Sequence, residues 1–266
     1  MRSIILILII LFLSNFKVDD KKTYLFNGKD LNGWDTYVAS ASKEIPSPGI
    51  NNDPDHVFSV VTIDGAPALR ISGESFAGIS TKNEFENYHL TIQFKWGQNK
   101  IPSFKDRKRD SGLLYHAVGP HGADARAWMR SQEFQIQEGD TGDYWGVAGG
   151  IFDVPATKNE KKELRYDAKG IMTIFSEGSP TGRRCWKNPD AEKPTGEWNT
   201  LDLYCSADSS VHVVNGVVVM RLYHSRQVDN GKETPLTKGK IQFQSEGCEI
   251  YYRGMILEPI KKIPAL

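Results

Sequence analysis

Short runs in which apolar and polar residues alternate recur along the chain, and Gly, Asp, Asn and Pro separate them. Alternation with a period of two is typical of β-strands, and no stretch of the chain sustains the 3.6-residue period of an amphipathic helix. We therefore predict an all-β protein, and the many short strands favour a sandwich or jelly roll. Strands are expected at His89–Trp96, Gly112–Ala117, Glu133–Gln137, Gly170–Phe175, Thr200–Cys205, Lys240–Gln244 and Glu249–Leu257.

Two tight turns are predicted with particular clarity. Asn215-Gly216 separates two apolar runs within Ser210–Met220, and Asn-Gly tolerates the positive φ angles of a two-residue type I′ turn. Asp64-Gly65 predicts a second hairpin in the same way. No repeat or linker interrupts the pattern, so a single domain is expected. Three stretches are predicted to be long loops, namely Ser40–Pro54, Gln98–Arg109 and Val154–Glu163.

The polar residues of several predicted strands share one face. Because successive side chains of a strand point to opposite sides, Glu133, Gln135 and Gln137 lie opposite Phe134 and Ile136. Amide side chains offer both donors and an acceptor, which suits sugar hydroxyls. The alternative is that these are the solvent-facing sides of ordinary antiparallel strands. The same alternation places Gln93 with Lys95, Gln242 with Gln244, and Leu114 with His116 on shared faces, and it places Tyr115 opposite the last pair. Three aromatic residues are expected in nearby loops, where they either stack on a pyranose ring or belong to the core: Trp128, Tyr144 and Trp145.

The first residues predict export. A short basic start leads into an uninterrupted apolar run from Ile4 to Leu13, which fits the roughly 7–15 residues of a signal-peptide core. It is shorter than the roughly 18 residues that favour a spanning helix, although an N-terminal anchor is the alternative. We assign residues 1–19 to a signal peptide and residues 20–266 to one domain. The mature protein is expected in the periplasm or at the cell surface, without a membrane span.

Charge and cysteine content exclude several classes. Lys plus Arg and Asp plus Glu both number 33, so no net charge attracts a nucleic acid, and none is expected as a partner. The three cysteines, Cys185, Cys205 and Cys248, have neither zinc-site nor redox-pair spacing. An odd number leaves at least one thiol unpaired, and a bridge between Cys185 and Cys205 stays open.

Six segments together resemble a known family, the 3-keto-disaccharide hydrolases. They occur in order as Leu25–Trp34, Asp110–His116, Glu133–Asp140, Gly196–Asn199, Gln242–Gly247 and Tyr252–Ile256. The resemblance spans roughly Tyr24 to Pro259. It implies a concanavalin A-like jelly roll of two antiparallel sheets, and action on glycosides or disaccharides whose C3 hydroxyl has been oxidised to a ketone. Many members of the family are exported.

The strand at Glu133–Gln137 provides only one carboxylate in phase, because Glu138 falls on the opposite face. A conventional glycosidase needs two carboxyl groups that flank the bond. A C3 ketone makes the C2 proton acidic, so a single base can start an elimination that hydration of the enone completes. We assign Glu133 and His116 as catalytic base or acid, in either order. The predicted substrate-binding residues are Lys95, Asp110, Gln135, Gln244, Glu246 and Trp145.

No cofactor is predicted, although a divalent metal bound by His116, Glu133 and Asp110 stays open, since these are acceptable ligand types. The expected partner is a small carbohydrate. A non-catalytic lectin-like carbohydrate-binding protein is the main alternative, because a fold does not fix a function. A conventional glycoside hydrolase and a structural surface protein are further alternatives. The sugar, the linkage and the oligomeric state leave no pattern in the sequence.

Overall fold

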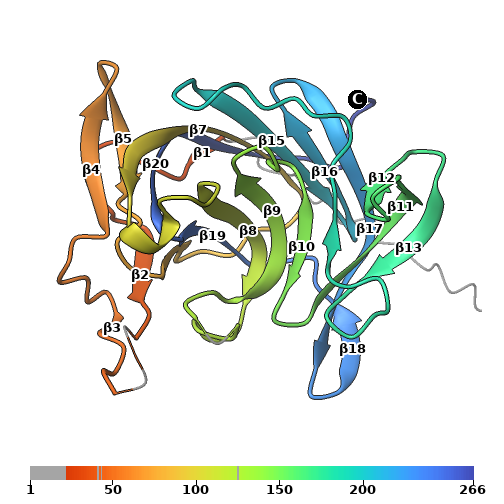
Figure 1. Cartoon of the computed structure of the whole chain (residues 1–266), viewed down its shortest axis with the longest axis horizontal. Coiled ribbons are helices and arrows are strands. Elements are labelled where there is room, and N and C mark those ends of the chain that lie inside the picture. Colours follow the sequence, from red (N-terminus) through yellow and green to blue (C-terminus); the bar gives the residue numbers. More distant parts are fainter. Residues whose placement is uncertain (1–21, 41, 43, 125) are drawn as a thin grey trace, which may run out of the picture.

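The computed structural model describes residues 22–266 except 41, 43 and 125, and it consists of two antiparallel sheets (Figure 1). The larger sheet has twelve strands. Its main path runs β12 (Leu164–Tyr166), β11 (Gly150–Lys158), β17 (Val217–Asp229), β16 (Ser209–Val214), β15 (Asn199–Ser206), β7 (Tyr88–Lys100), β20 (Cys248–Pro259), β5 (Ala66–Ile71) and β4 (Phe58–Ile63). Three strands pair beside this path: β1 (Thr23–Tyr24) with β20, β13 (Ile171–Phe175) with β11, and β18 (Lys232–Pro235) with β17.

The smaller sheet has eight strands and carries the site described below. Its order is β14 (Arg184–Cys185), β10 (Tyr144–Val147), β9 (Arg130–Gln137), β8 (Asp110–Val118), β19 (Lys240–Ser245), β6 (Ala77–Thr81), β2 (Trp34–Val38) and β3 (Gly49–Ile50). Among the described residues the helical structure is one 3₁₀ turn, Pro102–Phe104. The predicted all-β sandwich of two antiparallel sheets is therefore confirmed.

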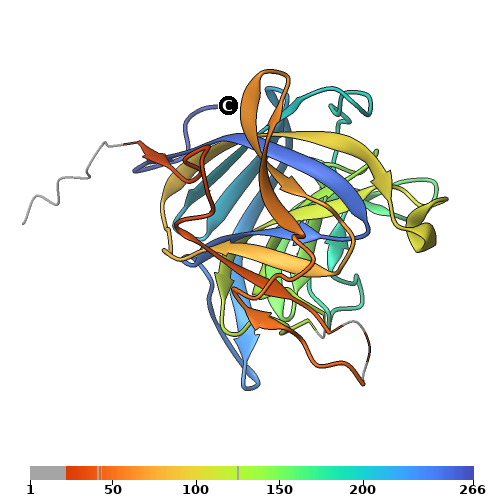
Figure 2. The same cartoon turned by 90° about the vertical axis from the view of Figure 1, so that its left-hand side faces the viewer.

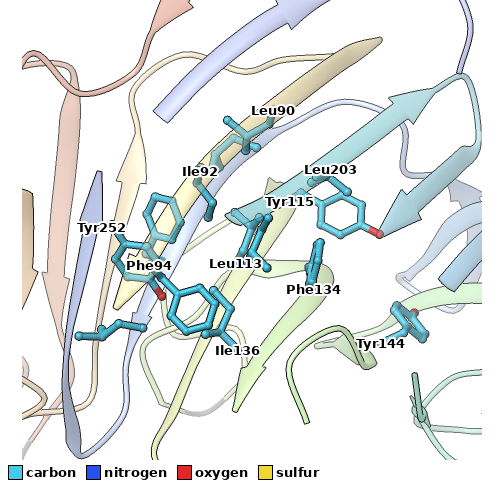
Figure 3. Close-up of a cluster of buried hydrophobic side chains, with 14 of the residues drawn as sticks. Leu90, Ile92, Phe94, Leu113, Tyr115, Phe134, Ile136, Tyr144, Leu203 and Tyr252 are labelled. Carbon is cyan, nitrogen blue, oxygen red and sulfur yellow. The ribbon is translucent and has the colours of Figure 1, made fainter. Parts of the chain in front are cut away.

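The core lies between the two sheets, which appear as separate layers in Figure 2, with β20 in one and β19 in the other. Period-two alternation directs one side of each strand into it, as in β15, where every second residue is buried. Each large apolar side chain buried there contributes roughly 1.5–3 kcal/mol to folding. Figure 3 shows the two sets of side chains that meet: Leu90, Ile92, Phe94, Leu203 and Tyr252 from the larger sheet, and Leu113, Tyr115, Phe134, Ile136 and Tyr144 from the smaller one.

Both predicted hairpins are confirmed. Asn215 and Gly216 have φ angles of 50° and 82° and join β16 to β17, as a type I′ turn requires. Asp64 and Gly65, with φ angles of 50° and 74°, join β4 to β5. The residue types of the turns were sufficient to predict both hairpins, because both residues of each turn tolerate the left-handed conformation.

The predicted loops are only partly correct. Val154–Glu163 was expected to be a loop, but its first half continues β11 as far as Lys158 and pairs with β12 and β13. Gln98–Arg109 likewise begins inside β7, which extends to Lys100, and then contains the 3₁₀ turn. Ser40–Pro54 contains the short strand β3. The charged cluster misled the prediction because it begins only at Lys158, the last residue of β11, where the strand becomes exposed.

The three cysteines are buried free thiols, so the Cys185–Cys205 bridge does not form. Burial raises the pKa of the Cys205 thiol to about 12. The predicted signal peptide falls outside the described residues. Within the described part of the chain, no helix has the length and apolar character needed to cross a membrane.

Candidate functional site

A cleft of about 550 Å³ opens on the outer face of the smaller sheet. Alternation in β8, β9 and β19 explains its floor: Leu113, Phe134 and Phe243 point into the core, so their neighbours along each strand point into the cleft. These three strands lie next to one another in the sheet (Figure 1). The lining side chains are Asp110, Asp124, Arg126, Trp128, Glu133, Gln135, Gln137, Trp145, Arg183, Arg184, Gln244 and Glu246.

Three carboxyl groups in the cleft come from three neighbouring segments. Asp110 begins β8, Glu133 lies in β9, and Glu246 directly follows β19. Asp110 and Glu246 are paired in an isolated antiparallel β-bridge and so stand directly opposite one another. Side chains that are paired in this way have Cβ atoms roughly 4.5–5.5 Å apart. The sheet therefore brings together carboxyl groups that the sequence distributes over 137 positions.

Amides and a guanidinium hold the Asp110 and Glu246 carboxyls. Asp110 stands opposite Gln137 in the register of β8 and β9, and Gln137 Nε2 donates to Asp110 Oδ2 at 2.5 Å. Gln135 Nε2 donates to Asp110 Oδ1 at 3.3 Å. Arg126 donates through a terminal nitrogen to Glu246 Oε1 at 2.9 Å. The two carboxyls are thus oriented by different partners.

Burial and mutual repulsion favour the protonated forms of all three acids. Desolvation raises the pKa of Asp110 to about 8, and the Glu246 carboxylate adds to this effect. Desolvation also raises the pKa of Glu246 to about 7, although Arg126 opposes the shift. The pKa of Glu133 is raised well above its usual value by burial first, and then by Glu246 and Asp110. Adjacent carboxyls of this kind share protons near neutral pH, which suits them to proton transfer.

The segment after β8 builds one wall of the cleft. Asp124 Oδ1 accepts hydrogen bonds from the backbone N–H groups of Arg126 and Trp128, which fixes the turn that presents both side chains. The Arg126 guanidinium lies 4.6 Å from the Phe76 ring centre and 5.4 Å from that of Trp128. Cation–π contacts of this kind restrict Arg126 to the position where it meets Glu246.

The opposite wall carries two further arginines around Trp145. Trp145 stands opposite Glu133 in the register of β9 and β10. The guanidinium groups of Arg183 and Arg184 each lie 5.2 Å from its ring centre. Arg184 also binds Asp143 Oδ2 through two nitrogens, at 2.8 and 2.5 Å, so its position is fixed.

A second hollow of about 420 Å³ adjoins the cleft and shares Asp110, Arg126, Gln137 and Glu246 with it. Its other walls are apolar and basic: Phe76, Phe104, Arg107 and Lys108. The carboxyl pair consequently lies at the junction of two differently lined spaces, one rich in amides and acids and one rich in aromatic rings. The cleft and the hollow together have room for a ligand made of two linked parts, one part in each space.

The structure brings six of the eight predicted site residues into this cleft, namely Glu133, Asp110, Gln135, Gln244, Glu246 and Trp145. It places His116 elsewhere. His116 is buried against the rings of Tyr88 and Tyr115, and its Nδ1 lies 3.1 Å from the Leu236 carbonyl oxygen. The prediction that it shares a face with Leu114 is wrong, because a bulge and a positive φ of 51° turn its side chain into the core.

Lys95 also lies outside the cleft. It belongs to β7 of the larger sheet, and its Nζ binds Asp64 Oδ2 at 2.9 Å on the outer side of that sheet. The predicted alternation of Gln93 and Lys95 against Phe94 is correct, but the two sheets turn their polar faces in opposite directions. Alternation sorts faces within a strand and does not assign strands to sheets.

Sequence reasoning missed Asp124, Arg126, Arg183 and Arg184 as site residues, and it did not select Gln137 and Trp128 from its own polar and aromatic groups. Gln137 carried a usable signal, since it is in phase with Glu133 and Gln135. The arginines carried none: Arg126 and Arg183 lie in loops, and Arg184 lies in the two-residue strand β14, whose pairing with β10 no local pattern predicts. The metal alternative lacks its His116 ligand here, and the described residues contain no group of three His, Cys, Asp or Glu side chains arranged to hold a metal ion.

The raised pKa of Asp110 predicts a cost in stability at alkaline pH. Its contribution to stability is fully present below the unfolded pKa near 4 and is lost as the pH rises through about 8. The difference in free energy of unfolding between Asp110→Asn and the wild type should therefore grow in favour of the variant as the pH rises from 4 to 9, by on the order of 2 kcal/mol. Urea unfolding at several pH values measures this gain. The exposed Asp55→Asn serves as the control, and an equal gain at pH 4 and pH 9 would contradict the explanation.

Comparison with known proteins identifies relatives. A family model described as a 3-keto-alpha-glucoside-1,2-lyase-like domain matches residues 21–258. Two crystal structures of proteins from Parabacteroides distasonis ATCC 8503, which carry the provisional name of glycosyl hydrolase, are similar in fold. One is 19% identical, with a TM-score of 0.50 over 90% of this chain and 94% of that chain. The other is 20% identical, with a TM-score of 0.51 over 90% of this chain and 100% of that chain. No curated protein matches the sequence.

Proposed function

Because the chain belongs to the 3-keto-alpha-glucoside-1,2-lyase-like domain family, we propose that it is an enzyme that cleaves the glycosidic bond of 3-keto-glycosides or 3-keto-disaccharides. Membership of this family supports a carbohydrate-active protein. The proposal for 3-keto substrates rests on a single observation: a buried carboxyl, Glu133, and two half-buried ones, Asp110 and Glu246, come from three neighbouring segments into a cleft lined with amides.

The carboxyl pair is suited to the first chemical step. A C3 ketone acidifies the proton at C2, and a base of pKa near neutrality removes it most effectively. Of the two opposed acids, Glu246 has the lower pKa, about 7, and Arg126 favours its ionised form. We assign Glu246 as the base and Asp110 as its proton-sharing partner. Gln137 and Gln135 position Asp110 through their amide donors.

The electron pair from the C2–H bond moves into an enolate whose oxygen is the former ketone oxygen. Arg126 and Arg183 line the cleft and supply the positive charge that such an oxygen needs. When the ketone re-forms, a C1–C2 double bond forms and the bond from C1 to the departing oxygen breaks. Water then adds at C1 and a proton returns to C2, which makes the net reaction a hydrolysis. If the product leaves before water adds, the enzyme is a lyase.

The two adjoining hollows suggest how a two-unit substrate lies. The amide-lined cleft offers hydrogen bonds for the oxidised ring, and Trp145 offers it an aromatic face. The hollow at Phe76 and Phe104 would then receive the departing unit, with Asp110 and Glu246 beneath the bond between them. Lys95 has no part in this proposal because it lies on the other sheet.

The N-terminal sequence supports a further proposal, that residues 1–19 direct export and are removed. The enzyme would then act in the periplasm or at the cell surface.

The test is to incubate the purified mature protein with a 3-keto-disaccharide and, in parallel, with the unoxidised parent sugar, and to follow products by mass spectrometry. Release of a 3-keto-sugar or its dehydrated form from the oxidised substrate alone is the expected result. Turnover of the unoxidised sugar would identify a conventional glycosidase, for which the cleft does hold more than one carboxyl. Binding of either sugar without any product would favour a lectin-like protein.

A further inference from the structure

A missing side chain shapes the floor of the cleft. Gly112 lies in the middle of β8, opposite Gln135 of β9. A Cβ atom at this position would lie 2.3 Å from Glu133 Oε1 and 2.4 Å from Gln244 Oε1, much closer than such contacts occur. Its φ angle is not in the left-handed region, so the backbone does not require glycine here. Glycine is needed because it has no Cβ, and the space that a Cβ would take is filled by two oxygen atoms from the neighbouring strands.

These two oxygens lack partners. Gln244 Oε1 is buried and accepts no hydrogen bond from any described residue. Glu133 is only 5% exposed, and no hydrogen bond or ion pair from the described residues reaches its carboxyl. A buried polar atom without a partner costs roughly 1–3 kcal/mol, and more if it is charged. An ionised Glu133 carboxylate beside the same space offers no donor, and so leaves the buried amide oxygen of Gln244 unsatisfied.

One proton removes the conflict. A carboxylic acid has an O–H donor, and the Gln244 Oε1 acceptor borders the same space at Gly112. The surrounding charges also favour the protonated form of Glu133. Three neighbouring acids raise its pKa and only Arg183 lowers it; the acids are Glu246, Asp110 and Asp124. We propose that Glu133 is kept as a carboxylic acid by donating its proton to Gln244 Oε1 in the space left by Gly112, and that it protonates the departing glycosidic oxygen.

This inference rests on the proposed function, and it gives Glu246 and Glu133 different proton-transfer roles. Glu246 takes the proton from C2, and Glu133 gives its own proton to the departing oxygen as the bond from C1 to that oxygen breaks. The Glu133 carboxylate then accepts a proton from the water that attacks C1, while Glu246 returns its proton to C2. Both acids regain their starting forms. Gly112 and Gln244 are positioning residues, since they act through Glu133.

The decisive experiment varies the leaving group. Glu133→Gln should lower kcat on a 3-keto-disaccharide by roughly 100-fold or more, the usual size of general acid catalysis. On the 3-keto form of a nitrophenyl glucoside, whose phenolate leaves without protonation, the same variant should lose less than about 10-fold. Gly112→Ala and Gln244→Met should show the same difference between substrates. Glu192→Gln is the matched control, because Glu192 is a half-buried acid with a raised pKa outside the cleft.

Infrared spectroscopy tests the protonation state without any substrate. The difference spectrum between wild type and Glu133→Gln at pH 7 should contain the C=O stretch of a protonated carboxyl. Gln244→Met should lower the pH at which that band disappears, because the acid form loses its acceptor. A shift to higher pH would mean that the amide donates to a carboxylate, and would overturn the proposal. Equal losses on both substrates would remove Glu133 as the acid, whereas no turnover of either substrate by the wild type would refute the proposed function.

Discussion

Asp110→Asn and Glu246→Gln should each lower kcat on a 3-keto-disaccharide by roughly 10²–10⁴-fold, the range expected when a general base or its partner is lost. Either amide leaves the cleft at the same volume but removes one proton site from the opposed pair. Glu246→Gln also leaves Arg126 without its carboxylate partner. Steady-state kinetics should show the loss in kcat rather than in KM, because the amides keep their hydrogen-bonding capacity towards the sugar.

The pH profile distinguishes this role from a structural one. The wild-type activity should rise as Glu246 ionises with a pKa of about 7, and Asp110→Asn should keep that rise near the same pH, because Asp110, with a pKa of about 8, is still protonated while Glu246 ionises. Lys95→Ala is the control within the originally predicted site and should retain activity, since Lys95 lies on the larger sheet. If Lys95→Ala loses as much activity as Asp110→Asn, the catalytic cleft has been placed on the wrong face.

Phe134→Ala should reduce the free energy of unfolding by roughly 3–5 kcal/mol, the usual cost of removing a buried phenyl ring. Phe134 is fully buried between the sheets and stacks on His212, with ring centres 4.0 Å apart. It also stands in β9 between Glu133 and Gln135, so a cavity behind it loosens the strand that presents both. Chemical denaturation measures the loss directly, and kcat should fall together with stability.

A graded series keeps this prediction informative even if the alanine variant does not fold. Phe134→Leu leaves a smaller cavity and should lose less stability than Phe134→Ala. Ile174→Ala removes an apolar side chain that is 50% exposed, and its effect should be within about 1 kcal/mol. A Phe134→Ala variant as stable as Ile174→Ala would show that β9 does not depend on this contact.

The resemblance to the family is confirmed, and so is the fold class, because both depend on local patterns that repeat along the chain. Period-two alternation separates Glu133 and Gln135 from Phe134 whatever the rest of the chain does. Turn residues such as Asn215 and Gly216 act locally in the same way. These features are set by backbone geometry over a few residues, so the sequence alone was enough to find them.

The composition of the site required the tertiary structure. Which strands are neighbours decides that Asp110 and Glu246 face each other, and that Lys95 lies on the other sheet. A single bulge removes His116 from the cleft, because one extra residue reverses every side chain that follows.

The sequence by itself determined the β pattern, the two hairpins and the polar face of β9, because each is encoded over a few neighbouring residues. Only the tertiary structure decided that Asp110, Glu133 and Glu246 share one cleft, that Arg126 and Arg183 line it, and that Gly112 leaves a space bordered by oxygens of Glu133 and Gln244. The physical reason is that burial and proximity to charge set the chemistry of a carboxyl group, and both are properties of packing between distant segments.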